Sequence, residues 1–253
     1  MNSFIASGIK SQVNKRVQPA NRTIHKLLLF AGIASSLLYV LMNILCPLLY
    51  VGYDSVSQTV SELSAIDAPT RPIWVPLGLA YTLLLVAFGL GVWRSSAENR
   101  SLRIVGALFA IHGFIGLFWP PMHQREVLAA SGGTMTDTMH ILFAMVTVPL
   151  MALEIGFGAA AFGKRFRIYS IISLAILMVF GILTGLDGPA IGKNLPTPFI
   201  GIWERINIGV FLLWVVVLAI VVLRMEERFV NKYIAEMYKD HHERPCRHAS
   251  QFE

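Results

Sequence analysis

The stretch at residues 206–223, INIGVFLLWVVVLAIVVL, runs for eighteen positions without a charged side chain and is followed by Arg224. A helix needs about 20 mostly apolar residues to cross roughly 30 Å of hydrocarbon, so this stretch predicts a membrane span. The rest of the chain has the same character: 55% of its 253 residues are hydrophobic and 14% are charged. The mean hydropathy is +0.61. This apolar content exceeds what a soluble core needs and predicts an integral membrane protein.

Five further apolar runs precede that stretch in the sequence. Alternation of apolar and polar residues, which a membrane β-barrel needs, is missing from them, so helices are the remaining way to cross a bilayer. We therefore predict an all-α polytopic membrane protein with a bundle of six transmembrane helices in residues 27–224. A basic arm, 1–26, and a basic tail, 225–253, flank that domain. The five further runs are 27–51, 73–93, 103–119, 139–162 and 168–186.

The positive charges are distributed unevenly over the connections. Seventeen Lys and Arg residues fall in the arm, the tail and the two connections near 94–103 and 164–167. Only Arg71, Arg125, Lys193 and Arg205 fall in the other three connections. Because Lys and Arg concentrate on the cytoplasmic side, this bias predicts cytoplasmic N and C termini in a cell (inner or plasma) membrane. The net charge of +6 then reflects topology and attraction to anionic lipid, and we expect no nucleic-acid partner.

The predicted outer connections are much longer than the inner ones. They cover 52–72, 120–138 and 187–205, and long connections can fold over a site, whereas short ones only join helices. In the first, the spacing predicts a short helix over 56–64 with Ser55 as its N-cap. In the second, Thr136 or Asp137 is expected to cap the fourth span. Any external function should therefore lie on the outer face.

Short motifs recur in these outer connections. SELSA occupies 61–65, PMHQR 121–125, DTMH 137–140 and WERI 203–206. Their order around six spans resembles the uncharacterised family catalogued as domain of unknown function 998, over about residues 27–224. The serine-acid-proline first loop is more weakly similar to the Frag1/DRAM/Sfk1 membrane proteins. The resemblance implies a six-span fold whose outer motifs act together, but no reaction, because the closer family has no assigned activity.

The polar residues of these outer motifs are candidates for a ligand site. We expect a polar cup that binds a small molecule, a lipid headgroup or a partner, with oligomeric state left open. Arg205 could bind a phosphate or carboxylate with two parallel hydrogen bonds, or it could join loops through ion pairs. The candidate ligand-binding residues are Glu62, His112, His123, Arg125, Asp137, His140, Asp187, Glu204 and Arg205.

A second hypothesis is a metal-assisted lipid hydrolase. Asp137 and His140 are three residues apart and share a helix face, so with His123 they could bind zinc, with Glu62 as the base. No H-E-x-x-H motif or cysteine cluster supports this, and the alternative interpretation is a capping aspartate and a histidine at headgroup level. The tail sequence HHERPCRH at 241–248 suggests adventitious metal binding.

A third hypothesis is a proton-coupled small-molecule transporter using His112 and Glu154. Helical rise places His112 at the same depth as Asn43 and Tyr81, which predicts a polar layer in the outer third of the bundle. Glu154 is the one acid inside a predicted span. It is expected level with the serines at 35 and 36, where it would form a hydrogen bond or belong to a proton path.

Overall fold

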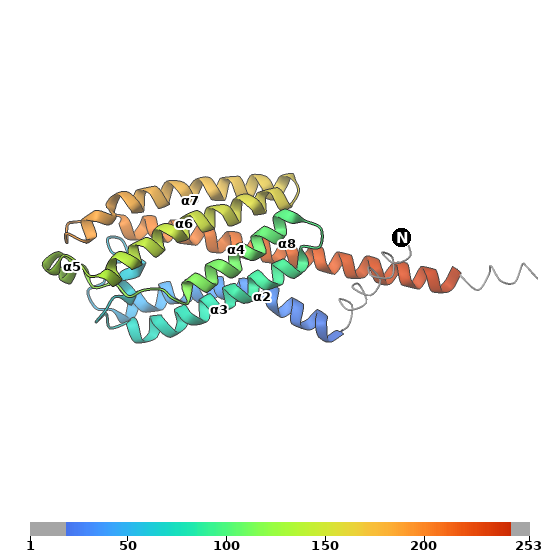
Figure 1. Cartoon of the computed structure of the whole chain (residues 1–253), viewed down its shortest axis with the longest axis horizontal. Coiled ribbons are helices and arrows are strands. Elements are labelled where there is room, and N and C mark those ends of the chain that lie inside the picture. Colours follow the sequence, from blue (N-terminus) through green and yellow to red (C-terminus); the bar gives the residue numbers. More distant parts are fainter. Residues whose placement is uncertain (1–18, 244–253) are drawn as a thin grey trace, which may run out of the picture.

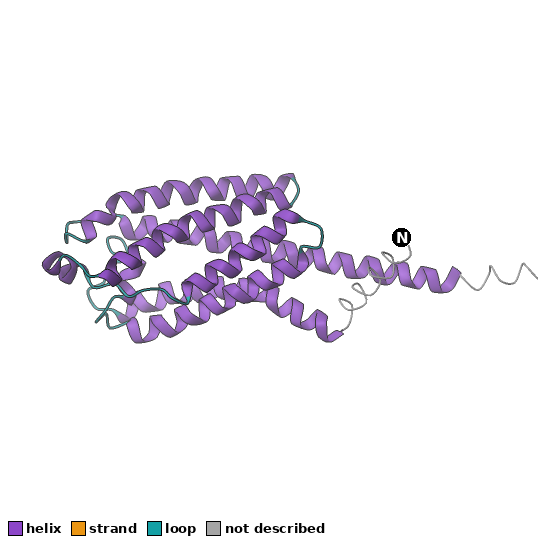
Figure 2. Cartoon of the chain, viewed as in Figure 1, coloured by secondary structure: helices purple, strands orange, loops and turns teal. Residues whose placement is uncertain are grey.

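The computed structural model describes residues 19–243, with side-chain positions for 21–235. Within that range all regular secondary structure is helical, joined by loops, and there is no strand (Figure 2). The basic arm up to residue 18 and the tail from 244 lie outside the described residues. The helices in chain order are α2 (Pro19–Leu49), the short 3-10 helix η1 (Val60–Ser64), α3 (Arg71–Ser95), α4 (Arg100–Gly116), α5 (Arg125–Ser131), α6 (Met135–Ala161), α7 (Lys164–Ile191) and α8 (Ile200–Glu243).

The six long helices form a closed ring in chain order. Successive helices α2, α3, α4, α6, α7 and α8 pack against one another, and α8 packs back on α2 (Figure 1). We call one end of the ring the turn end, because the tight connections 96–99 and 162–163 lie there. The other is the loop end. It carries the loop cluster, which we define as residues 50–70, 117–134 and 192–199.

Five helices in the described range are long and apolar enough to cross a membrane. They are Asn21–Leu49, Arg71–Ser95, Met135–Ala161, Lys164–Ile191 and Ile200–Ala235. The prediction of an all-helical, multi-pass membrane protein is therefore confirmed at this level. The remaining predicted span, 103–119, corresponds to α4, whose 17 residues cover only about 26 Å at 1.5 Å per residue.

The predicted helix boundaries were wrong at several ends. The third span was expected to reach residue 119, but α4 stops at Gly116. The ring of Pro120 would clash with the Gly116 carbonyl in a continuing helix, so residues 119–124 have no helical assignment. In contrast, α8 begins at Ile200 and not at 206. Hydropathy marks only the part of a helix suited to hydrocarbon, whereas the backbone hydrogen bonds continue into polar flanks.

The interior of the ring is packed at the turn end. Phe88, Phe109 and Trp214 are fully buried there within one large apolar cluster. Two glycines let α3 and α4 approach closely: a Cβ on Gly106 would lie 2.5 Å from the Trp93 nitrogen, and one on Gly89 would lie 2.5 Å from the Ala110 nitrogen. These backbone contacts leave no room for a side chain, so the turn end forms the rigid base of the bundle.

Candidate functional site

Glu62 organises the first part of the loop cluster. Its Oε2 accepts hydrogen bonds from the Thr59 backbone N–H at 2.7 Å and from the Thr59 hydroxyl at 2.9 Å. Thr59 is thus the N-cap of η1, in a capping box with Glu62. The prediction of a helix over 56–64 capped by Ser55 was wrong, because this box starts the helical turn only at Val60. The helix is correspondingly short.

Arg125 joins this turn to the other two parts of the loop cluster. Its Nε donates to Glu62 Oε1 at 2.7 Å and its Nη2 to Oε2 at 2.9 Å, a bidentate ion pair. The Glu62 side chain is 4% exposed, and its hydrogen bonds to Arg125 raise the pKa of that guanidinium. Arg125 Nη1 also donates to the Thr197 hydroxyl, which in turn donates to the Ser57 carbonyl. The three outer segments therefore meet.

Asp137 and His123 are brought together at the start of α6. Thr134, and not Thr136 or Asp137 as predicted, is the N-cap, and Asp137 completes its capping box from the N3 position. The buried Asp137 carboxylate accepts the Thr134 hydroxyl at 2.7 Å and the His123 backbone N–H at 2.7 Å. The His123 ring nitrogen Nδ1 lies 3.0 Å from Asp137 Oδ2. The aspartate thereby fixes both the helix start and the preceding loop.

His140 is held one turn further along α6. Its Nδ1 lies 2.8 Å from the Pro120 carbonyl, and its Nε2 lies 3.0 Å from the Ser61 hydroxyl. The Trp119 indole Nε1–H also lies 3.1 Å from this Nδ1; because an indole only donates and a carbonyl only accepts, Nδ1 engages one of these two partners according to the tautomer. Trp119 packs edge-on against the imidazole with 5.3 Å between ring centroids. Among residues with described side chains, no group of three His, Cys, Asp or Glu residues is arranged to hold a metal ion.

Arg205 and Glu204 bind the first outer segment to α8. Arg205 Nη1 donates to the carbonyls of Ser55 at 3.0 Å and Gln58 at 3.1 Å, and Nη2 donates to the Tyr53 hydroxyl at 2.6 Å. Burial raises the pKa of that phenol. Glu204 accepts the backbone N–H of Val60. Both residues therefore act on backbone and phenol groups of the loop cluster.

Asp187 stands apart from this network. It lies on α7, near the loop end, and its side chain forms no hydrogen bond or ion pair within the described part of the chain. Eight of the nine candidate ligand-binding residues instead have a polar partner in the structure. Those eight are Glu62, His112, His123, Arg125, Asp137, His140, Glu204 and Arg205.

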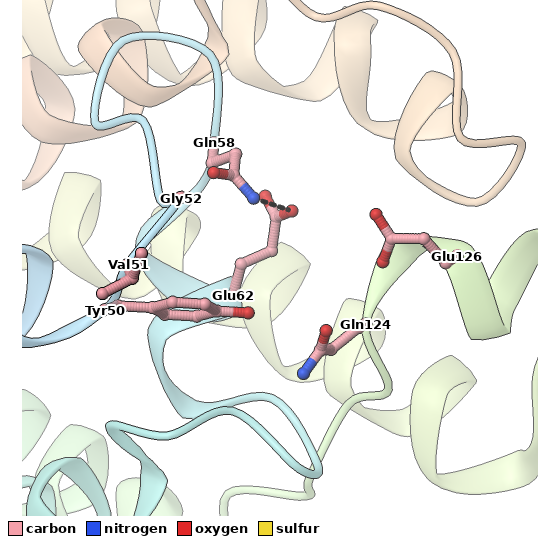
Figure 3. Close-up of a pocket in the computed structure, with 7 residues that line it drawn as sticks. All are labelled: Tyr50, Val51, Gly52, Gln58, Glu62, Gln124 and Glu126. Carbon is pink, nitrogen blue, oxygen red and sulfur yellow. Dashed lines mark hydrogen bonds between the residues drawn. The ribbon is translucent and has the colours of Figure 1, made fainter.

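A small polar hollow opens beside Glu62 (Figure 3). Figure 3 shows the Gln58 amide bonded to the Glu62 carboxylate, with the side chains of Gln124 and Glu126 on the other side of the gap. Its volume is about 160 Å³. Pockets for drug-sized ligands span roughly 300–1,000 Å³, so this hollow suits only a few water molecules or a small ion.

A much larger chamber lies below the loop cluster, inside the loop-end half of the ring. Its volume is about 1060 Å³. Most lining side chains are apolar, and the charged ones, Arg71, Asp137 and Glu204, all belong to the loop-end parts of their helices. Open space faces Gly78 on α3 and Gly185 on α7, where an added Cβ would meet no atom within 4 Å. The apolar part of the lining includes Leu79, Leu85, Ile141, Met145, Met178, Ile182 and Phe211.

His112 and Glu154 form a buried pair at the depth where the packed base begins. His112 Nδ1 lies 3.2 Å from Glu154 Oε1, and the Glu154 side chain is 0% exposed. The expected partners at 35 and 36 instead donate to the Gly32 and Leu212 carbonyls. That prediction assumed upright helices with level ends, whereas α4 runs obliquely across the ring (Figure 1). A proton path through Glu154 stays a prediction.

The predicted polar layer is only partly formed. Tyr81 and His112 both line the chamber, but Asn43 donates to the Tyr39 carbonyl and lies outside the lining. The Asn43 carbonyl oxygen Oδ1 is buried without a hydrogen-bond partner. Tyr81 packs on Tyr39 with 4.8 Å between ring centroids. Aromatic contact therefore replaces the expected hydrogen bonding between α2 and α3.

Several contributors to the loop cluster were missed from the sequence. Thr59 and Thr134 each stand three residues before an acid, a capping-box signature that could have identified them. Tyr53, Trp119 and Thr197 carry no comparable local signal, because their partners lie far away in the sequence. They could be found only once the three outer segments were known to meet.

The fold and the apolar chamber define a multi-pass helical membrane protein. A family model matches residues 33–221, and the chain belongs to that family, described as Protein of unknown function (DUF998). The match confirms the resemblance to this family but not the weaker likeness to Frag1/DRAM/Sfk1 proteins. No curated protein and no solved structure matches the chain.

Proposed function

We propose that the protein crosses the membrane six times and binds an apolar or amphipathic small molecule in the chamber. The loop cluster would close that chamber on the outer side, and both termini would lie in the cytoplasm. The observation that carries the proposal is the space of about 1060 Å³ that lies below the loops between the helices. This volume is at the upper end of the range of roughly 300–1,000 Å³ for small-molecule sites.

Two features support α4 as an additional, sixth membrane span and the cytoplasmic position of both termini. α4 lies in the ring between α3 and α6, and residues 117–124 continue from its end toward the loop end (Figure 1). Helix and extended segment together are long enough to reach across the hydrocarbon. Arg94, Arg103 and Lys164 lie at the turn end, as the positive-inside rule requires of the cytoplasmic side.

The chemistry of the lining favours an apolar or amphipathic ligand. Side chains such as Leu79, Met145 and Phe211 offer water no hydrogen bonds, so water molecules bind weakly in this space. A hydrocarbon group removes apolar surface from water at about 25 cal/mol per Å². His112 could form one hydrogen bond with the polar group of an amphipathic ligand, because its Nε2 has no hydrogen-bond partner within the described part of the chain.

The loop cluster is better suited to closure than to catalysis. The side chains of Glu62, Arg125 and Asp137 already accept or donate several hydrogen bonds to one another or to the backbone. Groups engaged in this way stabilise a fixed geometry and are costly to separate. We therefore propose binding under a rigid polar cover, and not a reaction at these residues.

The test uses purified full-length protein in detergent, with oleyl alcohol as the probe. A ligand that binds the folded state raises the Tm with its concentration. We expect such a rise in the wild type and none in Gly78→Trp, whose indole would project into the open space beside α3 that the probe has to occupy.

Gly156→Trp is the matched control. Gly156 is also a helical glycine with open space around it, but it does not line the chamber. It should behave as the wild type. An unchanged Tm in the wild type, or an equal rise in both tryptophan variants, would refute chamber binding.

A further inference from the structure

The chamber wall is incomplete between α3 and α6. In the ring, α4 separates these two helices, but it ends at Gly116, and only the non-helical residues 119–124 follow it toward the loop end. Gly116, Leu117 and Pro121 line the chamber at this point. The gap therefore lies where the loop cluster meets the chamber, on the side between α3 and α6.

On both sides of this gap, apolar side chains line the chamber and are also exposed on the outer surface of the helical ring. Leu79 on α3 is 49% exposed and Met145 on α6 is 68% exposed, yet both line the chamber. Val75 and Ile141, one turn nearer the loop end, share this property. Since α3 and α6 are both able to cross a membrane, these side chains face lipid tails. The chamber then opens sideways into the bilayer.

The charged groups that line the chamber, Arg71, Asp137 and Glu204, are gathered at its loop end. Arg71 is the first residue of α3 and lines the chamber there. Its Nη1 donates to the Ser64 carbonyl, but it forms no ion pair within the described part of the chain. A guanidinium keeps further donors in a planar fork that suits phosphate oxygens. A positive group above an apolar space matches an anionic headgroup above a hydrocarbon chain.

From these observations we propose that the occupant is a glycerophospholipid from the surrounding leaflet. One acyl chain enters between α3 and α6 and fills the apolar part of the chamber, while the phosphate binds Arg71 at the rim. This inference rests on the proposed ligand chamber and adds to it the class of ligand, its source and its route.

The test places the full chain in vesicles of phosphatidylglycerol that contain a photoactivatable phosphatidylglycerol with a diazirine near the end of one acyl chain. Irradiation followed by mass spectrometry identifies the labelled residues. We expect adducts on His112 and Met151, which line the chamber and are only 6% and 8% exposed, so that lipid outside the bundle does not reach them. Adducts confined to outward-facing residues would overturn the proposal.

Two variant pairs separate chain entry from headgroup recognition. Gly78→Trp should abolish the adducts on His112 and Met151, whereas Gly156→Trp should leave them unchanged. Arg71→Gln should reduce them about tenfold, as expected for a loss of about 1.4 kcal/mol of charge-assisted binding. Arg94→Gln, at the other end of the same helix, is the matched control and should have no effect.

A diacylglycerol with the same diazirine chain isolates the role of the phosphate. We expect it to label the wild type and Arg71→Gln equally weakly. Equal labelling of the wild type by both lipids would overturn phosphate recognition. If oleyl alcohol stabilises the protein but neither lipid labels the interior, the chamber stands and the lipid proposal fails. If oleyl alcohol also has no effect, the proposed function fails with it.

Discussion

Glycines of the packed base and glycines that face the chamber have opposite surroundings. At the turn end, a side chain at Gly89 or Gly106 would meet the backbone of the neighbouring helix at 2.5 Å. At the loop end, a side chain at Gly78, Gly185 or Gly188 would meet nothing within 4 Å. The same residue type thus brings helices together at Gly89 and Gly106 and leaves space between them at Gly78, Gly185 and Gly188. The difference separates a packed base from a chamber, and substitutions in each half should have different consequences.

The largest expected effect is in the packed base. Gly106→Leu should prevent accumulation of folded protein, because α3 and α4 cannot both keep their positions around the new side chain. Overpacking typically costs about 1–3 kcal/mol and more where backbone must move. Size-exclusion chromatography of the detergent-solubilised protein measures this outcome. Gly78→Leu is the control in the other half, and a folded Gly106→Leu with unchanged Tm would contradict a packed base.

The loop cluster should respond next most strongly. Arg125→Gln leaves the buried Glu62 carboxylate without its ion-pair partner, and breaking such a pair costs about 3–5 kcal/mol. A large fall in Tm is therefore expected. The double variant Glu62→Gln with Arg125→Gln should recover part of the loss, since no unpaired charge remains. No recovery would show that Glu62 acts mainly as the helix cap.

A smaller effect is expected at the boundary between the two halves. Glu154→Gln keeps an oxygen that accepts the hydrogen bond from His112 Nδ1, so the loss should be about 1 kcal/mol, that of one altered hydrogen bond. Thermal unfolding in detergent measures it. His112→Leu provides the contrast, because Glu154 then loses its ring partner. A Glu154→Gln loss as large as that of His112→Leu would indicate that the pair needs its full charge.

The smallest effect on stability is expected in the chamber itself. Replacing a helical glycine improves helix propensity by roughly 0.5–1 kcal/mol, and Gly78→Trp meets no atom that would offset this gain. The Tm without added ligand should therefore be unchanged or slightly raised, as in Gly156→Trp. A strong destabilisation confined to Gly78→Trp would mean that the chamber collapses and is not an open space.

The sequence predicted the helical class because runs such as 206–223 have one physical solution in a bilayer. It could not predict that α4 stops at Gly116, since hydropathy continues through Phe118 and Trp119 while two prolines end the helix. The chamber arises from this early end, together with the glycines on α3 and α7. Such a space depends on how helices diverge, which no local pattern encodes.

The candidate site shows the same division. The sequence identified polar residues of the loop cluster from their positions in the outer connections, and two capping boxes were readable from Thr59 and Thr134. The pairs that these residues form could not be predicted from the sequence. Arg125 and Glu62 are 63 positions apart, and His112 and Glu154 are 42 positions apart. The tilt of α4 brings His112 close to Glu154. Depth estimates that assumed upright helices placed the two side chains at different levels and missed this pair.

The most direct test of a ligand chamber in the loop-end half is native mass spectrometry of the protein after mild detergent extraction. The account predicts one retained phospholipid per chain in the wild type and in Gly156→Trp, and none in Gly78→Trp. Wild-type protein without bound lipid, or equal retention in both tryptophan variants, would contradict it.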